Sequence, residues 1–363
     1  MNYTIKKTGK PAYMQLYEQL RADVTGGVYA YGSKLPSKRL LAEETGVSVI
    51  TAEHACAILA DEGYVEPRER SGYYVTYRAG DFLGDAAQIA KTWRTPEKSA
   101  LIAPVPSAIS YPTLARTARR VISEYGERLL VKSPNSGIPE LRTSVADYLA
   151  RSGGLNVSPE QIVIGSGAEY LYTLVVQLLG MERTFAVEDP SYEKIRRVYR
   201  SFGAKVEKLP LTANGISREA LENSRADVLH ITPFNSYPSG VTADASKRRE
   251  YLNWARRRGG YVIEDNYDSE LTVSRKNDDT VFSLDSDGRV IYLNTFSHTV
   301  APSIRVGYML LPRTMIDVFN DRLGFLSCTV PVFEQFLIAD LLSSGEFERH
   351  INRVRRRKRR GGI

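Results

Sequence analysis

A regular alternation of helical patterns with short apolar runs, from about residue 106 onward, most constrains the fold of this chain. The apolar runs are QIVIGSG, TFAVEDP, VLHITPF, GYVIEDN, VIYLNTF and VGYMLLP. Strands that alternate with helices form a mostly parallel sheet with helices on both faces. We therefore expect this part of the chain to be an α/β domain.

Residues 11–75 have a different pattern, that of a small helical module followed by a hairpin. An apolar pattern of helical period starts after Pro11 and predicts the first helix. Ser37 and Ser48 are suitable N-caps for two further helices. Two β-rich pieces, joined by the charged turn PRERSG, then predict a hairpin. These pieces are Tyr64–Glu66 and Tyr73–Tyr77.

The two helices expected after Ser37 and Ser48 are joined by a tight turn, as in a helix-turn-helix. The second helix of this motif enters the major groove, while the first helix and a wing contact phosphates. The residues expected to contact DNA are Ser37, Lys38, Arg39, Ser48, Val49, Ile50, Thr51, His54, Arg68, Arg70, Ser71 and Gly72. The pattern alone is also compatible with other small three-helix domains.

This module resembles the GntR-type winged helix-turn-helix over its full length. The elements LPS-x-R-x-LA, GVS-x-x-T and EGY…R-x-R-S-G-Y occur in that order. The resemblance implies binding to a double-stranded DNA operator by a homodimer that reads paired half-sites. Val49 stands where the family commonly has Arg, and Leu40 replaces an acidic residue. The first departure removes one expected DNA contact, so the operator sequence does not carry over.

Net charge adds little to the prediction of DNA binding. The formal charge is +7, but residues 353–360 hold seven basic side chains, so the remainder of the chain is neutral. We interpret this tail as the solvated start of a longer helix; a nucleic-acid arm is the alternative. No long apolar run, signal-peptide core or metal-ligand spacing is present, and there are two cysteines. We therefore expect a cytoplasmic protein without a membrane span, metal site or disulfide framework.

Polar residues follow several strands of the expected sheet, where open α/β sheets bind ligands. The turn Gly165–Glu169 opens a helix and is a suitable phosphate cradle. Asp265 follows another strand, although by itself it is more readily interpreted as a helix cap or loop acid. Thr295, Ser297 and Arg305 surround a third strand end. These groups match several needs of pyridoxal phosphate, which requires a carboxylate, a stacking aromatic ring, a phosphate site and a lysine amine.

Residues 106–352 resemble the aminotransferase-like domain of MocR-type regulators, in which a GntR-type reader precedes a fold-type I domain. The matching segments include VEDPSYEKIRRVY, YVIEDNYDSEL and NTFSHTVAPSIRVGYMLLP. The resemblance implies that Asp265 pairs with the pyridine nitrogen, Tyr267 approaches the ring hydroxyl and Tyr192 stacks on the ring. It further implies a phosphate site formed by Gly167, Ala168, Thr295, Ser297 and Arg305.

His298 occupies the position at which the family has its aldimine lysine. Imidazole has no primary amine, so it forms no stable Schiff base, and no catalytic residue is assigned. Whether this histidine is natural or introduced stays open. ITPFNSYPSG also departs from the family's Ser-His-Gln run at Phe234–Ser236. Relatives continue beyond HINRVRRR into a small subdomain that supplies a substrate-binding Arg, which we expect to be truncated here.

The expected organisation is a DNA-binding domain at 1–77, a linker at 78–105, an aminotransferase-like domain at 106–352 and a basic tail at 353–363. The favoured function is a transcription regulator that holds pyridoxal phosphate or a related small-molecule effector noncovalently, without turnover. Two alternatives remain: a transaminase, and a degenerate regulator with an empty effector site.

Overall fold

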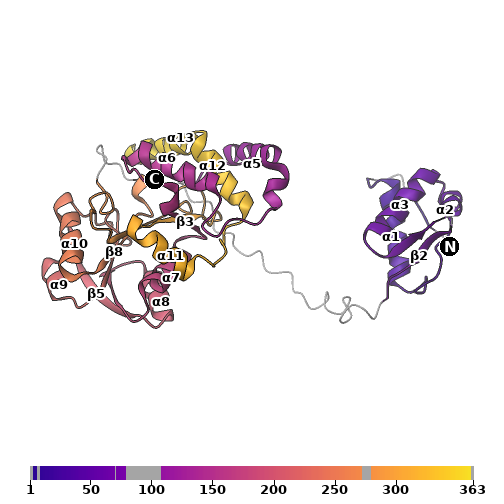
Figure 1. Cartoon of the computed structure of the whole chain (residues 1–363). Coiled ribbons are helices and arrows are strands. Elements are labelled where there is room, and N and C mark those ends of the chain that lie inside the picture. The colour runs from indigo at the N-terminus through magenta and orange to yellow at the C-terminus, as the bar shows by residue number, and fades with distance from the viewer. Residues whose placement is uncertain (1–2, 6–8, 70, 79–107, 272–278, 361–363) are drawn as a thin grey trace. The chain divides into compact units, whose positions relative to one another are not determined.

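The computed structural model describes residues 3–5, 9–69, 71–78, 108–271 and 279–360. The chain divides into two compact units, Met1–Leu101 and Ile102–Ile363, each with its own hydrophobic core (Figure 1). Apart from Arg78, the expected linker lies outside the described residues, as does Arg70. Within the described ranges, no helix is both long and apolar enough to cross a bilayer.

The first unit contains the expected helices and hairpin. Its elements are α1 (Ala12–Thr25), α2 (Lys38–Thr45), α3 (Val49–Asp61) and the antiparallel strands β1 (Val65–Arg68) and β2 (Gly72–Val75). The predicted caps form, since Ser37 Oγ accepts the Leu40 amide at 3.2 Å and Ser48 Oγ accepts the Thr51 amide at 3.1 Å. Between α2 and α3, Gly46 adopts φ +70°, a conformation that glycine reaches without strain. The winged helix-turn-helix is thus confirmed.

The described part of the second unit is built on an eight-stranded sheet in the order β3-β10-β9-β8-β7-β4-β5-β6. The strands are β3 (Ile162–Gly165), β4 (Thr184–Asp189), β5 (Lys205–Thr212), β6 (Gly215–Ile216), β7 (Val228–Ile231), β8 (Tyr261–Asp265), β9 (Val290–Thr295) and β10 (Gly307–Leu310). Strand β10 runs antiparallel to both of its neighbours, and β6 is antiparallel to β5. The central strands are parallel, which confirms a mostly parallel sheet.

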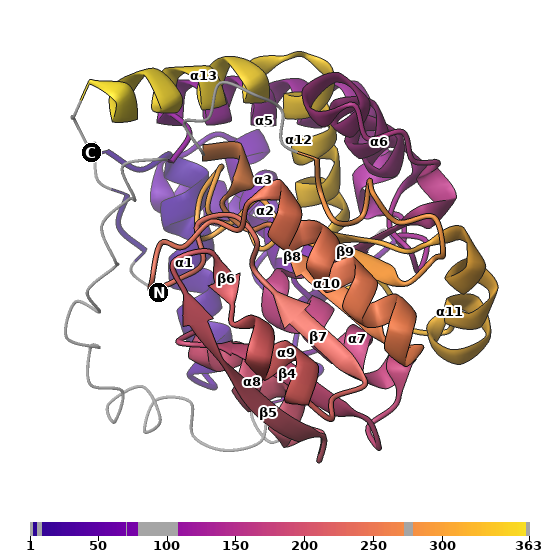
Figure 2. The same cartoon turned by 90° about the vertical axis from the view of Figure 1, so that its left-hand side faces the viewer.

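Helices cover both faces of this sheet. Successive strand residues point to opposite faces, so each strand contributes side chains to the core on either side. Ile162 and Ile164 pack in one core cluster, whereas Val163, between them, packs in another. The helices are α5 (Tyr111–Tyr125), α6 (Pro139–Gly153), α7 (Ala168–Leu179), α8 (Glu193–Ser201), α9 (Arg218–Asn223), α10 (Ala245–Arg258), α11 (Ile316–Leu323), α12 (Val332–Ser343) and α13 (Glu346–Arg359). Two views show α5, α6, α12 and α13 gathered along the upper edge of the unit (Figures 1 and 2).

The basic residues near the end of the chain belong to α13. This helix runs without a break through the expected boundary at residues 352 and 353. Its apolar face is buried by Phe347, Ile351 and Val354, which join the same core cluster as α5, α6 and α12. The segment 353–359 is therefore a folded helix with one packed face.

Candidate functional site

A pocket of about 550 Å³ lies at the carboxyl ends of β8 and β9 and at the start of α7. The residues that line it are Ala168, Glu169, Tyr172, Tyr192, Ile195, Thr232, Asn235, Tyr237, Asp265, Tyr267, Asp268, Thr295, Ser297, His298, Pro302, Arg305 and Lys358. All residues predicted for the cofactor site are in this lining except Gly167. Gly167 borders it, because a Cβ atom there would lie 2.5 Å from Arg305 Nη2. Residues distant in sequence are thus brought to one cavity.

Asp265 forms the buried side of the pocket. It is the last residue of β8 and is 3% exposed, which does not fit the alternative of a loop acid. Its Oδ2 accepts a hydrogen bond from Tyr172 Oη and lies 3.6 Å from His230 Nε2. His230 Nδ1 in turn is 2.6 Å from Tyr199 Oη. A buried polar network therefore holds the Asp265 carboxylate in place.

Sequence reasoning missed Tyr172, His230 and Tyr199. Tyr172 lies four residues after Ala168, so helical spacing places it on the same face of α7 as a residue that was selected. Burial and the nearby Asp265 carboxylate raise the pKa of Tyr172 well above its usual range, so its hydroxyl keeps the proton that it donates. His230 lies within the apolar run VLHITPF, which gave no indication of a polar network.

The opposite end of the pocket carries the groups predicted for a phosphate. Gly167 has φ +86° and immediately precedes α7, so the amides of the first turn face this end. Ser297 Oγ lies 3.1 Å from Thr295 Oγ1 and donates to Ile304 O at 3.0 Å. Arg305 is half-exposed beside them. Hydroxyls, amides and a guanidinium group are the donors that bind phosphate in proteins.

Glu169, which sequence reasoning did not assign, engages the cations at this end. Its Oε2 is 2.5 Å from Arg305 Nη2, and its Oε1 is 2.8 Å from Lys194 Nζ. Partial burial opposes ionisation of Glu169, but hydrogen bonds from Lys194 and Arg305 outweigh it and lower its pKa to about 2. An anionic ligand that binds Arg305 must therefore compete with an internal carboxylate.

His298 lies in the pocket next to a second buried carboxylate. Its Nδ1 is 2.9 Å from Oδ1 of Asp268, whose side chain is 4% exposed, and Asn235 Nδ2 donates to Asp268 Oδ2. The Tyr267 ring lies edge-on to the imidazole at a centroid distance of 5.8 Å. Burial disfavours the charged form of Asp268, yet its contacts with His298, Lys358 and Asn235 lower its pKa. The imidazole ring is thus oriented by its neighbours.

Helix α13 supplies Lys358 to the pocket lining, a residue that sequence reasoning left in the basic tail. Lys358 Nζ donates to Leu271 O at 3.4 Å, and Arg355 Nε donates to Glu270 O at 2.6 Å. These bonds attach α13 to η3 (Ser269–Leu271). The pocket therefore contains a primary amine, but on a helix far in sequence from His298.

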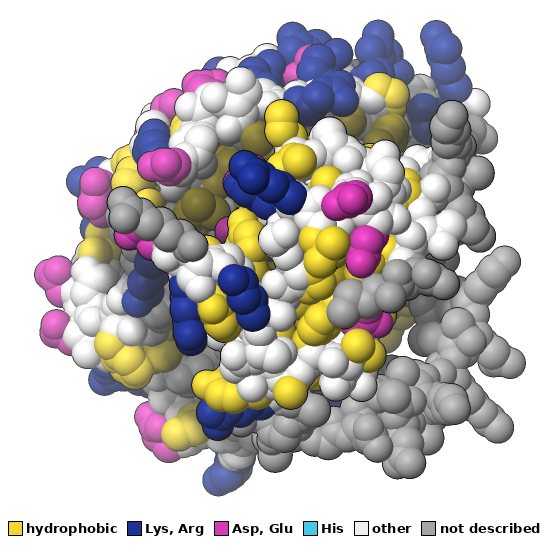
Figure 3. Space-filling view, turned by 90° about the vertical axis from the view of Figure 1, so that its right-hand side faces the viewer, with side chains coloured by type: hydrophobic (Ala, Val, Ile, Leu, Met, Phe, Trp, Pro, Cys, Tyr) yellow, Lys and Arg dark blue, Asp and Glu magenta, His cyan; other side chains and the backbone are white. Residues whose placement is uncertain are grey.

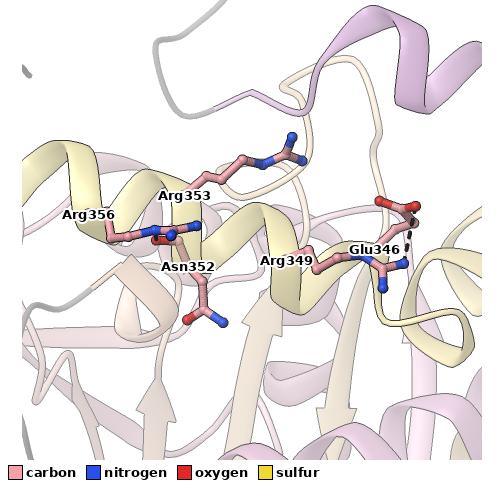
Figure 4. A pocket seen from close by; sticks show the side chains of 5 residues that line it. All are labelled: Glu346, Arg349, Asn352, Arg353 and Arg356. Carbon is pink, nitrogen blue, oxygen red and sulfur yellow. Dashed lines mark hydrogen bonds and ion pairs between the residues drawn. The ribbon is translucent and has the colours of Figure 1, made fainter.

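The outer face of α13 is strongly basic. Arg349, Asn352, Arg353 and Arg356 line a shallow hollow of about 250 Å³ together with Glu346, which pairs with Arg349 at 3.1 Å (Figure 4). Lys and Arg side chains also run along the upper edge of Figure 3, at the height of α13 in Figures 1 and 2. Most of the net positive charge of the chain therefore lies on α13, whose seven basic and two acidic side chains contribute +5 of the formal +7.

In the first unit, several of the residues predicted to contact DNA have partners within the same unit. Lys38 Nζ pairs with Glu53 at 2.6 Å, and the His54 ring stacks on Tyr13 at a centroid distance of 4.2 Å. Thr51 Oγ1 lies 2.8 Å from Ser48 Oγ. Arg39, Val49 and Ile50 are exposed, as are Ser48 and His54.

The wing residues lie at the tip of the β1–β2 hairpin. Arg68 pairs with Glu66 at 2.6 Å and lies over the Tyr74 ring, 4.2 Å from its centroid. Ser71 Oγ is 2.7 Å from Tyr74 Oη. Gly72 adopts φ +120°, and a Cβ atom there would lie 3.1 Å from Lys34 Cε. The described residues of the hairpin tip therefore have contacts within the first unit.

Both units match known families. Residues 12–75 match the bacterial regulatory proteins of the gntR family, and residues 107–360 match aminotransferase class I and II. This chain belongs to the MocR-type GntR regulators. It is 31% identical to the pyridoxine biosynthesis regulator PdxR of Corynebacterium glutamicum, over 94% of this chain and 75% of that protein. It is 29% identical to the probable rhizopine catabolism regulator MocR of Rhizobium meliloti, over 95% and 74% respectively.

Solved aminotransferases share the fold of the second unit of this MocR-type chain. An archaeal alanine:glyoxylate aminotransferase superposes with a TM-score of 0.63 at 26% identity, over 68% of this chain and 63% of that one. LysN, the α-aminoadipate aminotransferase of Thermus thermophilus, superposes with a TM-score of 0.62 at 28% identity, over 70% and 65%. The chain thus spans slightly less than two thirds of these enzymes. It is a DNA-binding transcription regulator with an aminotransferase-like domain.

A buried carboxylate bonded to the pocket residue Thr232 predicts a pH dependence of stability. Glu188 accepts hydrogen bonds from the Thr232 amide at 3.1 Å and from Ser236 Oγ at 2.6 Å, and its burial raises its pKa from 4.5 to about 7. The folded protein therefore keeps a proton that the unfolded chain releases between these pH values. The contribution of this group to stability is present below pH 4.5 and is lost as the pH rises to about 7.

We expect Glu188→Gln to flatten this part of the stability profile. Thermal unfolding measured between pH 4.5 and 8 should show a Tm that falls less with rising pH in the variant than in the wild type. Glu219→Gln, which changes an exposed carboxylate on α9, is the control and should leave the profile unchanged. An identical profile for wild type and Glu188→Gln would contradict the assignment.

Proposed function

We propose that the second unit binds pyridoxal phosphate, or a closely related phosphorylated pyridine, noncovalently and that its occupancy controls DNA binding without turnover. The observation that carries this proposal is the position of His298. It lies in one pocket with Asp265 and Arg305, where the family has a lysine. This site has partners for the ring and the phosphate of the ligand, but imidazole in place of the lysine amine. We therefore expect the ligand to bind reversibly.

The residues present fit such a ligand. A Cβ atom at Gly167 would collide with the Arg305 guanidinium, so the close approach of this cation to the start of α7 depends on glycine. At the other end, the buried Asp265 carboxylate can hold a proton on a pyridine nitrogen. Tyr192, which also lines the pocket, provides an aromatic face. When bound, pyridoxal phosphate supplies an aldehyde and an electron-withdrawing ring.

His298 and Asp268 determine what this chain can do next to the ligand's aldehyde. The imidazole can accept or donate a hydrogen bond, and its Nδ1 lies 2.9 Å from Oδ1 of the buried Asp268 carboxylate. Neither group forms a lasting bond to carbon in this role. We therefore assign binding and proton-holding roles to the pair.

Control of DNA binding requires two arrangements of the homodimer that differ in affinity for the effector. In this proposal, pyridoxal phosphate or an amine-bearing adduct of it is the small-molecule effector, and a double-stranded operator with paired half-sites is the macromolecular partner. The name of the PdxR relative, which refers to pyridoxine biosynthesis, supports an effector of this chemistry.

The test combines thermal unfolding with borohydride reduction of the purified protein. Added pyridoxal phosphate should raise the Tm of the second unit. Mass spectrometry after borohydride treatment should find no modified lysine, and Lys358, which lines the pocket, is the residue to inspect first. An unchanged Tm at saturating ligand would show an empty site, and a reduced adduct on any lysine in the pocket would refute noncovalent binding.

A further inference from the structure

The first turn of α3 exposes two apolar side chains. Ile50 is 79% exposed and Val49 is 40% exposed. The opposite face of the helix is buried in the core of the unit by Ala52, Ala55 and Leu59. Helical spacing therefore directs residues 49 and 50 outward, together with residues 53 and 54. In a helix-turn-helix, this turn of the second helix faces the base edges of the major groove.

The polar side chains on this face already have partners inside the protein. Thr51 Oγ1 lies 2.8 Å from Ser48 Oγ, and Glu53 is paired with Lys38 at 2.6 Å. The His54 ring is stacked on Tyr13. Val49 and Ile50 have neither donors nor acceptors, so they cannot pair with the polar base edges that an arginine at this position would read.

Exposed cations on neighbouring elements indicate that this apolar turn faces DNA rather than a protein. Lys34 and Arg39 are exposed before α2 and in its first turn, and Arg68 is exposed on the hairpin. Cations in these positions match the phosphate strands that border a major groove. Where this turn faces the major groove, its apolar side chains are matched by an apolar group on the nucleic acid.

We propose that Val49 and Ile50 read the C5-methyl groups of thymine. Among the four bases of B-DNA, thymine presents a methyl group in the major groove, and apolar side chains recognise it by contact. The operator half-site of this protein therefore contains thymine at the position that the first turn of α3 contacts. This inference rests on the DNA-binding function and is independent of pyridoxal phosphate.

The experiment uses the full chain and a duplex that the chain itself selects from a random double-stranded library. Each thymine of the selected duplex is then replaced, one at a time, by deoxyuridine, which lacks the C5-methyl group. We expect about a fourfold loss of affinity at one or more positions, the equivalent of about 0.8 kcal/mol for one buried carbon. The affinities are measured by fluorescence anisotropy at one fixed salt concentration, because phosphate contacts depend on salt.

Variants assign the loss to the two side chains. Ile50→Ala and Val49→Ala change exposed residues, so the unit should stay folded, and each should bind the thymine and uracil duplexes more nearly equally than the wild type does. Val28→Ala is the matched control, because Val28 is an exposed apolar residue of the same unit, at 64%, outside the helix-turn-helix. Val28→Ala should keep the full loss.

Three results would overturn the proposal, and they separate a failure of methyl recognition from a failure of DNA reading. Equal affinity of the wild type for thymine and uracil duplexes, or a loss that persists in both α3 variants, would exclude methyl recognition while leaving DNA binding intact. A library from which no sequence is enriched would show that the first unit does not read sequence. That result would refute the methyl reading and the operator-binding function together, without bearing on ligand binding by the second unit.

Discussion

Replacing His298 with lysine should convert reversible retention of pyridoxal phosphate into covalent capture. The substitution places a primary amine at the pocket position where the family has one, and His298 is 42% exposed, so a longer side chain has room. Asp268 lies 2.9 Å from the present imidazole and favours the charged ammonium form of a lysine there. Because the neutral amine is the nucleophile, capture should increase as the pH rises above neutrality.

The readout is a mass increase on residue 298 after borohydride reduction, located by peptide mass spectrometry. His54→Lys is the matched control, since it makes the same substitution at an exposed histidine of the first unit, outside the pocket. It should gain no adduct. If His298→Lys binds pyridoxal phosphate but stays unmodified at high pH, His298 does not face the ligand's aldehyde.

Arg305→Ala should weaken pyridoxal phosphate binding by about 10- to 100-fold. A hydrogen bond to a charged group contributes about 1.5–3 kcal/mol, and Arg305 is the cation that lies against the start of α7. The decisive comparison uses pyridoxal, which has the ring but no phosphate. Its affinity, measured by equilibrium dialysis, should be nearly the same for wild type and Arg305→Ala.

Glu169→Gln is the complementary variant and should tighten binding, because Glu169 pairs with Arg305 at 2.5 Å and competes with a phosphate for it. Arg313→Ala, which removes an exposed arginine beside α11, should change neither affinity. A parallel loss of pyridoxal and pyridoxal phosphate affinity in Arg305→Ala would indicate a structural role for Arg305 instead of a phosphate contact.

Much of the fold follows from local patterns. Alternating apolar runs and helical segments predict a mostly parallel sheet, and the serine caps at Ser37 and Ser48 begin the helices that they were expected to begin. The antiparallel direction of β10 was not predicted. It depends on which neighbours a strand pairs with, and β10 lies between β3 and β9, whose residues are distant in sequence.

The candidate site was likewise predicted only in part from the sequence. Asp265, Thr295 and Arg305 were selected because polar residues at strand ends converge in open sheets. Glu169 and Tyr172 were not selected, since their importance comes from partners 136 and 93 residues away, Arg305 and Asp265. No periodicity or spacing encodes such a contact.

The sequence alone therefore determined the two-part organisation, the mostly parallel sheet and the reader helices, because each is a matter of residue type and local period. The family resemblance added that His298 stands at the position of a lysine. The tertiary structure decided which charged side chains lie close together. It paired Glu169 with Arg305 and Asp268 with His298, and it brought Lys358 of α13 into the same pocket. Electrostatic interactions depend on distance in space, and only packing brings these groups together.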